Sequence, residues 1–227
     1  MKSNDKKKII ERYEGRLKEF GPKQKALGWL KGRQKFRFYF LEQITSSNEN
    51  DSILDVGCAY ADLYGYLNEN GWKGKYCGVD IVPGLITEAK KRYPGVDARI
   101  VDILEDNFNE KYDWIYCSGA LTSKTEDVDS YDHLEAMLTK MFSICNKGIA
   151  VNFCSPIVDF QSDVNFHPEF DKLIKMILKL SKRFSIRHDY MPYEFTVYIY
   201  KDDQVNKDAN IFSAKDELYK VLKVNDE

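Results

Sequence analysis

Short apolar runs alternate with longer amphipathic segments through the middle of the chain. The apolar runs, each bounded by polar or glycine positions, predict β-strands at 52–57, 76–81, 98–103, 112–119 and 148–155. The amphipathic segments predict helices at about 61–70, 84–92 and 131–146. Strands that are separated by a helix imply right-handed crossovers, and therefore a mostly parallel sheet that is covered by helices on both faces.

The two ends of the chain break this alternation. Apolar residues at 9, 10, 13, 17 and 20 predict a helix over 9–20 that ends at Gly21–Pro22, and a second helix is predicted at 35–44. After a helix at about 168–182, the runs RFSIRHDY and EFTVYIYK are joined by too few residues for a crossover. They must reverse direction as a hairpin, which adds an antiparallel last strand to a seven-stranded sheet.

These elements predict a doubly wound α/β fold with three parts. Residues 1–48 form an N-terminal helical extension that caps the substrate side, and residues 49–201 form the core. Residues 202–227 form a polar C-terminal tail with one weak helix at about 214–222.

Composition narrows the classes of protein. With 43% hydrophobic and 31% charged residues, the 227-residue chain has the make-up of a globular protein. It contains no run near the roughly 18 apolar residues of a membrane span, and its basic start does not resemble a signal peptide, so we expect a cytoplasmic location. Five cysteines without a CxxC pair predict buried thiols, and three histidines that are far apart along the chain give a metal site little support.

Charge is unevenly distributed along the sequence. Residues 1–40 hold 13 basic and 4 acidic side chains, whereas the whole chain has a net charge of -2. A basic segment on an acidic body favours an anionic ligand, although a solvated helix face explains the same pattern.

Acidic residues end three successive predicted strands, at Asp55, Asp80 and Asp102. Because ligands of parallel α/β sheets bind at the carboxyl ends of the strands, these acids are expected at one site. An acid that ends the second strand can accept hydrogen bonds from both hydroxyls of a ribose.

The stretch ILDVGCAYADL resembles a nucleotide-binding turn that lacks two glycines. A dinucleotide pattern that starts at Gly57 places Ala59 and Asp62 where glycines are required, so NAD fits poorly. Since alanine prefers negative φ, we expect that Gly57 keeps the essential turn and that Ala59 and Ala61 avoid the left-handed region.

Four stretches in order resemble the motifs of class I S-adenosylmethionine-dependent methyltransferases. They are ILDVGCAYADL, YCGVDIVPGLITEAKKRYP, RIVDIL and YDWIYCSGAL, and the resemblance covers roughly residues 30–200. It implies a Rossmann-like methyltransferase fold with an antiparallel seventh strand and S-adenosyl-L-methionine as the cofactor.

The resemblance also implies roles for individual residues. Asp55 and Gly57 would lie beside the methionine part of the cofactor, Cys58 and Ala59 would also contact the cofactor, and Asp80 would bind its ribose. Ile81 would line the adenine, while Asp102 and Ile103 would pair with its polar edge. Ser118 and Gly119 would lie beneath the sulfonium.

Candidate acceptor-side residues come from the N-terminal helices and from loops at the carboxyl edge. In RHDYMPYEF we expect His188 to act as a base and Tyr190 and Glu194 to position the acceptor, although the same residues could simply pack a hairpin. His167, in a loop long enough to form a lid, is a second candidate base, or else a residue at a helix start.

Two further groups of residues could contact a ligand. Asn152 could hydrogen-bond the acceptor. Trp29 and Arg33, with Arg37, could hold the donor carboxylate or a substrate phosphate, or else be a core anchor and surface charges.

The sequence therefore predicts an S-adenosylmethionine-dependent methyltransferase. The expected acceptor is an O or N atom of a small molecule, or of a sugar- or nucleotide-linked glycan precursor, with an anionic group as an option. Nucleic-acid methylation is the first alternative, and it is disfavoured because CSGAL follows the fourth strand where adenine-amino enzymes have Asn/Asp-Pro-Pro-Tyr. A non-catalytic protein that binds the same cofactor is the second alternative.

Overall fold

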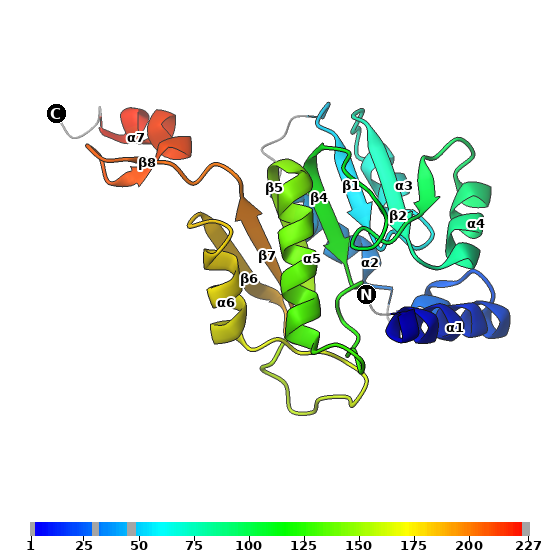
Figure 1. Cartoon of the computed structure of the whole chain (residues 1–227). Helices are drawn as coiled ribbons and strands as arrows, with labels where there is room; N and C mark the ends of the chain where they lie inside the picture. The colour runs from blue at the N-terminus through cyan, green and yellow to red at the C-terminus, as the bar shows by residue number, and fades with distance from the viewer. Residues whose placement is uncertain (1–2, 29–31, 45–48, 224–227) are drawn as a thin grey trace.

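Seven strands form one mixed sheet in the order β3-β2-β1-β4-β5-β7-β6 (Figure 1). The computed structural model describes residues 3–28, 32–44 and 49–223. The strands are β1 (Ile53–Val56), β2 (Tyr76–Asp80), β3 (Ala98–Ile100), β4 (Tyr112–Ser118), β5 (Cys145–Cys154), β6 (Phe184–Met191) and β7 (Glu194–Tyr200). β1 to β5 pair in parallel, so the predicted doubly wound fold is confirmed. Strand order reverses between β1 and β4, where such folds bind their ligands.

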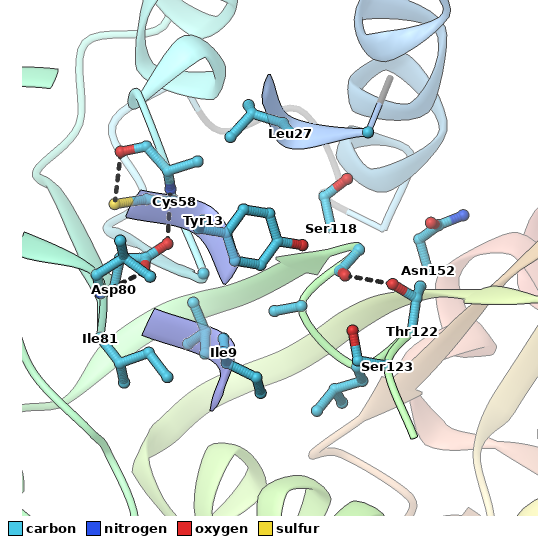
Figure 2. Close-up of a pocket in the computed structure, with 18 of the residues that line it drawn as sticks. Ile9, Tyr13, Leu27, Cys58, Asp80, Ile81, Ser118, Thr122, Ser123 and Asn152 are labelled. Atoms are coloured by element: carbon cyan, nitrogen blue, oxygen red, sulfur yellow. Dashed lines mark hydrogen bonds between the residues drawn. The ribbon is translucent and has the colours of Figure 1, made fainter. Parts of the chain in front are cut away.

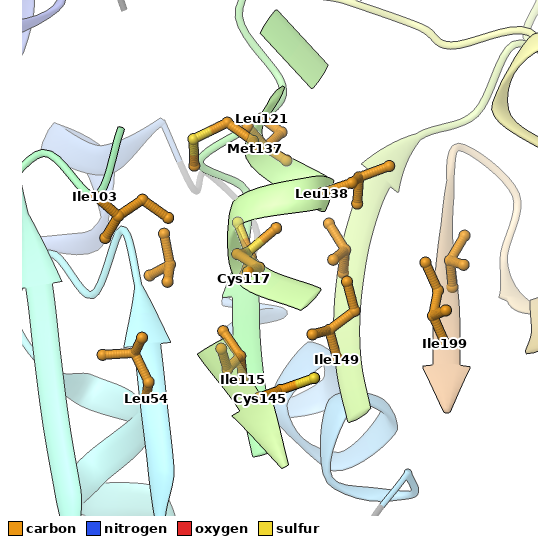
Figure 3. Close-up of a cluster of buried hydrophobic side chains, with 14 of the residues drawn as sticks. Leu54, Ile103, Ile115, Cys117, Leu121, Met137, Leu138, Cys145, Ile149 and Ile199 are labelled. Atoms are coloured by element: carbon orange, nitrogen blue, oxygen red, sulfur yellow. The ribbon is translucent and has the colours of Figure 1, made fainter. Parts of the chain in front are cut away.

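Helices cover both faces of this sheet. They are α2 (Gln34–Glu42), α3 (Asp62–Glu69), α4 (Pro83–Arg92), α5 (Ser130–Ile144) and α6 (Phe170–Leu178). α5 and α6 lie on the near face in Figure 1, and their buried side chains pack with Leu54, Ile115 and Ile149 from the sheet (Figure 3). α2, α3 and α4 supply the buried residues of the opposite face. Parallel strands that are covered in this way are apolar on both faces, which is why they read as continuous apolar runs.

The terminal hairpin also follows the prediction. β7 pairs antiparallel with both β5 and β6, so β6 runs in the direction of the first five strands. The connection between β6 and β7 therefore lies at the carboxyl edge of the sheet, next to the end of β5, where Cys154 pairs with Glu194.

The N-terminal extension crosses the carboxyl edge as α1 (Ser3–Phe20), followed by a short 3-10 helix at Gln24–Leu27. Three side chains fix α1 to the first turn of α4 and to loops of the core. Glu14 accepts from the Gly84 N–H at 2.7 Å, Asp5 accepts from the Glu126 N–H at 2.9 Å, and Lys6 lies 3.2 Å from Asp102. The extension thus covers the edge at which the predicted ligand-binding acids end their strands.

The C-terminal segment is more structured than the sequence indicates. A two-stranded hairpin, β8 (Val205–Asn206) with β9 (Ile211–Phe212), precedes a 3-10 turn at Ser213–Lys215 and α7 (Asp216–Lys223), and this unit projects from the body (Figure 1). Asn206 pairs with Asp216 at 2.9 Å and Asn210 turns at φ 55°, which are local contacts that hydrophobic patterning does not register.

The cysteines and the character of the helices bear on the expectations from composition. All five cysteines are free thiols, four of them buried, as predicted. Of the helices in the described residues, none has both the length and the apolar character that crossing a membrane requires.

Candidate active site

A cavity of about 600 Å³ opens at the carboxyl edge of the sheet, beside the point where strand order reverses. Residues at or just beyond the ends of β1 to β5 line it, together with Glu194 of β7, and helices α1, α2 and α5 complete its walls. Its volume falls within the range of small-molecule sites, roughly 300–1,000 Å³.

Most of the sequence-predicted site residues line this one cavity. They are Arg33, Asp55, Gly57, Cys58, Ala59, Asp80, Ile81, Asp102, Ile103, Ser118, Gly119 and Glu194. Arg37 and Asn152 line it as well. Trp29 lies outside the described residues. The structure therefore brings the predicted cofactor residues together with part of the predicted acceptor side.

The turn between β1 and α3 corrects one expectation. Gly57 has φ 76°, and a Cβ at this position would lie 2.4 Å from the Ala120 Cβ, so glycine is required there. Ala59 and Ala61, however, have φ 47° and 55°, so both lie in the left-handed region that we expected them to avoid. The turn keeps the backbone course of a glycine-rich motif, and each alanine costs roughly 1–2 kcal/mol for it.

Backbone hydrogen bonds explain why the alanines accept this conformation. The N–H groups of Gly57 and Cys58 both donate to the Val79 carbonyl, at 2.8 and 3.1 Å. The Ala59 N–H donates to Asp80 Oδ2 at 3.0 Å. Because three successive amides are directed at the end of β2, the turn has little freedom to relax to negative φ.

Three carboxylates line one half of the cavity, which we call the donor half and define by Asp55, Asp80 and Asp102. Burial raises the pKa of Asp55 to about 7, although the Tyr76 hydroxyl donates to it at 2.8 Å. Burial also raises the pKa of Asp80 to about 6, an effect that the N–H groups of Val82 and Ala59 reduce. Asp102 is buried beside Lys6. Carboxylates that are costly to ionise favour a ligand with a positive centre, whose charge would offset the desolvation.

A polar network borders the other half of the cavity, which we call the acceptor half and define by Ser118, Asn152, Cys154, Arg37 and Glu194. Arg37 donates from Nε and Nη2 to the two carboxylate oxygens of Glu194, and both side chains are almost fully buried. Asn152 donates to the Tyr190 hydroxyl at 3.1 Å and to Glu194 at 3.4 Å.

Tyr13 and His133 line the cavity, although the sequence predicted a site role for neither. The ring of Tyr13 projects from α1 into the pocket, with its hydroxyl on the side of Ser118 (Figure 2). His133, on α5, lines the cavity beside Met137, and burial lowers the pKa of its imidazole. Tyr13 belongs to the apolar stripe of the first predicted helix, which indicates only that one face of α1 is covered.

The two predicted bases lie elsewhere. Neither His188 nor His167 is among the residues that line the cavity, and Tyr190 reaches it only through Asn152. The His188 ring packs against Phe170 and Phe195, with centroids 6.2 and 6.3 Å apart. His167 Nδ1 lies 2.6 Å from the Ser155 carbonyl. The pairing of β6 with β7 is irregular between Arg187 and Met191, and the His188 ring lies against Phe170 of α6, so we assign no proton transfer to either histidine.

Comparisons with known proteins agree with the fold. Residues 53–148 match a family model described as a methyltransferase domain. "Putative methyltransferase Rv1506c" of Mycobacterium tuberculosis is 26% identical over 164 residues, which cover 70% of this chain and 98% of that protein. "Putative methyltransferase 235L" of Invertebrate iridescent virus 6 is 28% identical over 99 residues, 44% of this chain and 37% of that protein.

Solved structures show the same architecture at low identity. Magnesium protoporphyrin IX methyltransferase (ChlM) from Synechocystis PCC 6803 with bound SAH has a TM-score of 0.62 and 14% identity, covering 87% of this chain and 99% of that one. The DhpI–SAH complex has a TM-score of 0.63 and 14% identity, covering 83% and 93%.

Proposed function

The chain is a class I S-adenosylmethionine-dependent methyltransferase, and we propose that it methylates an oxygen or nitrogen atom of a small molecule or glycan precursor. The observation that carries this proposal is the single cavity that joins the ends of β1, β2 and β3 to the acceptor half. One cavity can therefore hold the donor and the acceptor group side by side.

The donor half has the chemistry that the cofactor requires. S-adenosylmethionine, when bound, supplies a methyl group on a positively charged sulfur that is already activated for displacement. Asp80 would accept from the ribose hydroxyls, Ile81 would pack on the adenine, and Asp102 would accept from its amino group. Asp55 places a further carboxylate in the same half of the cavity, near the Gly57 turn. These acidic side chains suit an uncharged adenosine with a cationic sulfonium better than they suit a pyrophosphate.

The acceptor half would position the incoming nucleophile. Displacement at a methyl carbon needs the acceptor atom, the methyl group and the sulfur in line, so the contribution of the protein is mainly orientation. Ser118 and Asn152 offer hydrogen-bonding groups next to the donor half, and the Arg37–Glu194 pair fixes the wall behind them. Because α1 covers the site, an acceptor group that enters end-on suits it better than a nucleic-acid duplex.

Release of S-adenosylhomocysteine in the presence of acceptors tests this function. We expect release to depend on a small-molecule fraction of a cell extract and to be lost in the Asp80→Asn variant. Binding of S-adenosylmethionine without transfer to any acceptor fraction would instead indicate a non-catalytic protein that binds the cofactor. Transfer to nucleic acid alone would indicate a nucleic-acid methyltransferase.

A further inference from the structure

None of the described side chains that define the acceptor half is a free base at neutral pH. Ser118 and Asn152 are neutral groups that do not act as bases unaided. Burial raises the pKa of the Cys154 thiol to about 11, so this thiol stays protonated. Glu194 is the acid of this half, and Arg37 occupies both of its carboxylate oxygens.

His133 is the histidine among the described residues that line the cavity, and it is not one of the residues that define the acceptor half. Asp102 and Asp5 are the acids whose charges act on its imidazole, and Ile9 and Met137 line the cavity with it. His133 also lines a smaller pocket with Ser123, Thr125 and Ser130, and none of the residues that define the acceptor half lines that pocket. Among the described residues that define the acceptor half, an alcohol or protonated amine would therefore find no free base.

Positive charge, by contrast, is abundant around the cavity. Four arginines line it, and two of them have internal partners. Arg16 donates to the carbonyls of Lys25 and Ala26 at 2.5 and 2.7 Å, and Arg37 pairs with Glu194.

The other two arginines are Arg12 and Arg33. Arg12 lies on α1 with its guanidinium 5.8 Å from the centre of the Tyr13 ring. Arg33 is half-buried at the start of α2, one helical turn before Arg37, and forms an ion pair with no carboxylate of the described chain. A half-buried guanidinium in a cavity without a carboxylate partner is suited to an anion from outside.

We propose that the acceptor atom is an anionic oxygen of a carboxylate or phosphoryl group, and that this group is held by Arg33, which lines the same cavity one helical turn before Arg37 of the acceptor half. This inference rests on the proposed methyltransferase function. The oxygen forms a bond to the methyl carbon while the carbon–sulfur bond breaks, and the electron pair of that bond remains on sulfur. The products are a methyl ester and neutral S-adenosylhomocysteine. No proton is transferred, which accounts for the lack of a base.

Anion binding tests the role of Arg33 without turnover. Inorganic phosphate is titrated into the protein saturated with S-adenosylhomocysteine and followed by ³¹P line broadening. We expect weak binding to the wild type, at least a 10-fold loss in Arg33→Gln, and no change in Lys35→Gln. Lys35 is a matched control because it lies two residues away and is exposed, 2.5 Å from Glu69.

The same variants separate Arg33 from a role in donor binding. Equal phosphate binding by Arg33→Gln and wild type would overturn the inference. It would also be overturned if Arg33→Gln weakened S-adenosylmethionine binding by 10-fold or more while phosphate binding stayed the same, because the side chain would then hold the donor carboxylate.

The chemistry of the product provides the second test. Protein, methyl-labelled S-adenosylmethionine and a cell extract are incubated, and the labelled product is isolated. A carboxylate ester would release labelled methanol in mild base, whereas a phosphoryl ester would survive it and show coupling between the methyl protons and phosphorus. Label in an ether or an amine would contradict the inference while supporting the methyltransferase function. Failure of the protein to bind the donor would contradict the proposed function instead.

Discussion

The carboxylate of Asp80 accepts a hydrogen bond from the backbone N–H of Ala59 at 3.0 Å, while Ala59 itself has a left-handed φ of 47°. The acid at the end of β2 therefore has two functions in our account. It would bind the cofactor ribose under the proposed function, and it holds the turn after β1 in the conformation that glycine would adopt more easily.

The left-handed alanines lead to a prediction about stability. Ala59→Gly should raise the free energy of unfolding by about 0.5–1 kcal/mol, since relief of the φ strain exceeds the entropy that glycine adds to the unfolded chain. Ala61→Gly should be close to neutral, because Ala61 is fully buried and its methyl contributes about 0.8 kcal/mol that glycine loses. Urea unfolding of the ligand-free protein measures both.

An exposed helical alanine is the matched control. Ala136, in the middle of α5, has ordinary helical geometry, so Ala136→Gly should destabilise the protein by about 1 kcal/mol. If Ala59→Gly destabilised the protein by a similar amount, the left-handed geometry of the turn would be refuted.

The pKa values of Asp80, about 6, and Asp55, about 7, predict opposite effects of pH on folding and on binding. Both values are raised, so between pH 4 and pH 7 the folded protein binds more protons than the unfolded chain. The contribution of these two acids to the free energy of unfolding should therefore fall as pH rises through this window. Affinity for S-adenosylmethionine should instead decrease as pH falls below 6, approaching tenfold per pH unit, because protonated Asp80 is a poorer acceptor.

The Asp80→Asn variant distinguishes protonation of Asp80 from other causes of weaker S-adenosylmethionine binding in acid. The variant should bind S-adenosylmethionine at least 10-fold more weakly at pH 8 and lose most of the pH dependence near 6. Asp97→Asn is the control, since Asp97 pairs with Arg99 at 2.7 Å outside the cavity. A wild-type affinity that did not vary between pH 5 and pH 8 would count against ribose binding by Asp80.

The Arg37–Glu194 pair should be costly to break. Both side chains are nearly buried, so Glu194→Gln removes the carboxylate that balances the Arg37 charge and should destabilise the protein by about 3 kcal/mol. Lys179→Met is the surface control; it breaks the exposed pair with Glu135 and should cost less than about 1 kcal/mol. Equal costs in thermal unfolding would show that the Arg37–Glu194 pair is accessible to water.

The positions of the histidines predict that neither His188 nor His167 is a general base. His188→Gln and His167→Gln should change turnover by less than about threefold, against the 100-fold or more that loss of a base costs. His188→Gln should still lower thermal stability, because the ring packs between Phe170 and Phe195. A 100-fold loss of turnover with unchanged stability would return His188 to the mechanism.

The sequence predicts the core well because parallel strands and their helices carry strong periodic signals. Asp55, Asp80 and Asp102 end successive strands, and the topology alone brings strand ends to one edge. Reversal of the last strand was also predictable, since the connection after Met191 is too short for any other path.

Other features depend on contacts between distant segments. Tyr13 reaches the cavity because Glu14 and Asp5 fix α1 to the start of α4 and to a loop, about 70 and 120 residues away along the chain. A helical stripe does not reveal what covers it. The φ values of Ala59 and Ala61 follow from amides that bond to the end of β2, and residue type alone predicts the opposite. His188 was misplaced because the side of the sheet that it faces depends on the register of β6.

Calorimetric titration with S-adenosylmethionine tests the central claim most directly. We predict one binding site per chain with a dissociation constant in the micromolar range at pH 8, and at least a 10-fold weaker constant for Asp80→Asn. No heat of binding at millimolar ligand, with folded protein, would contradict the account.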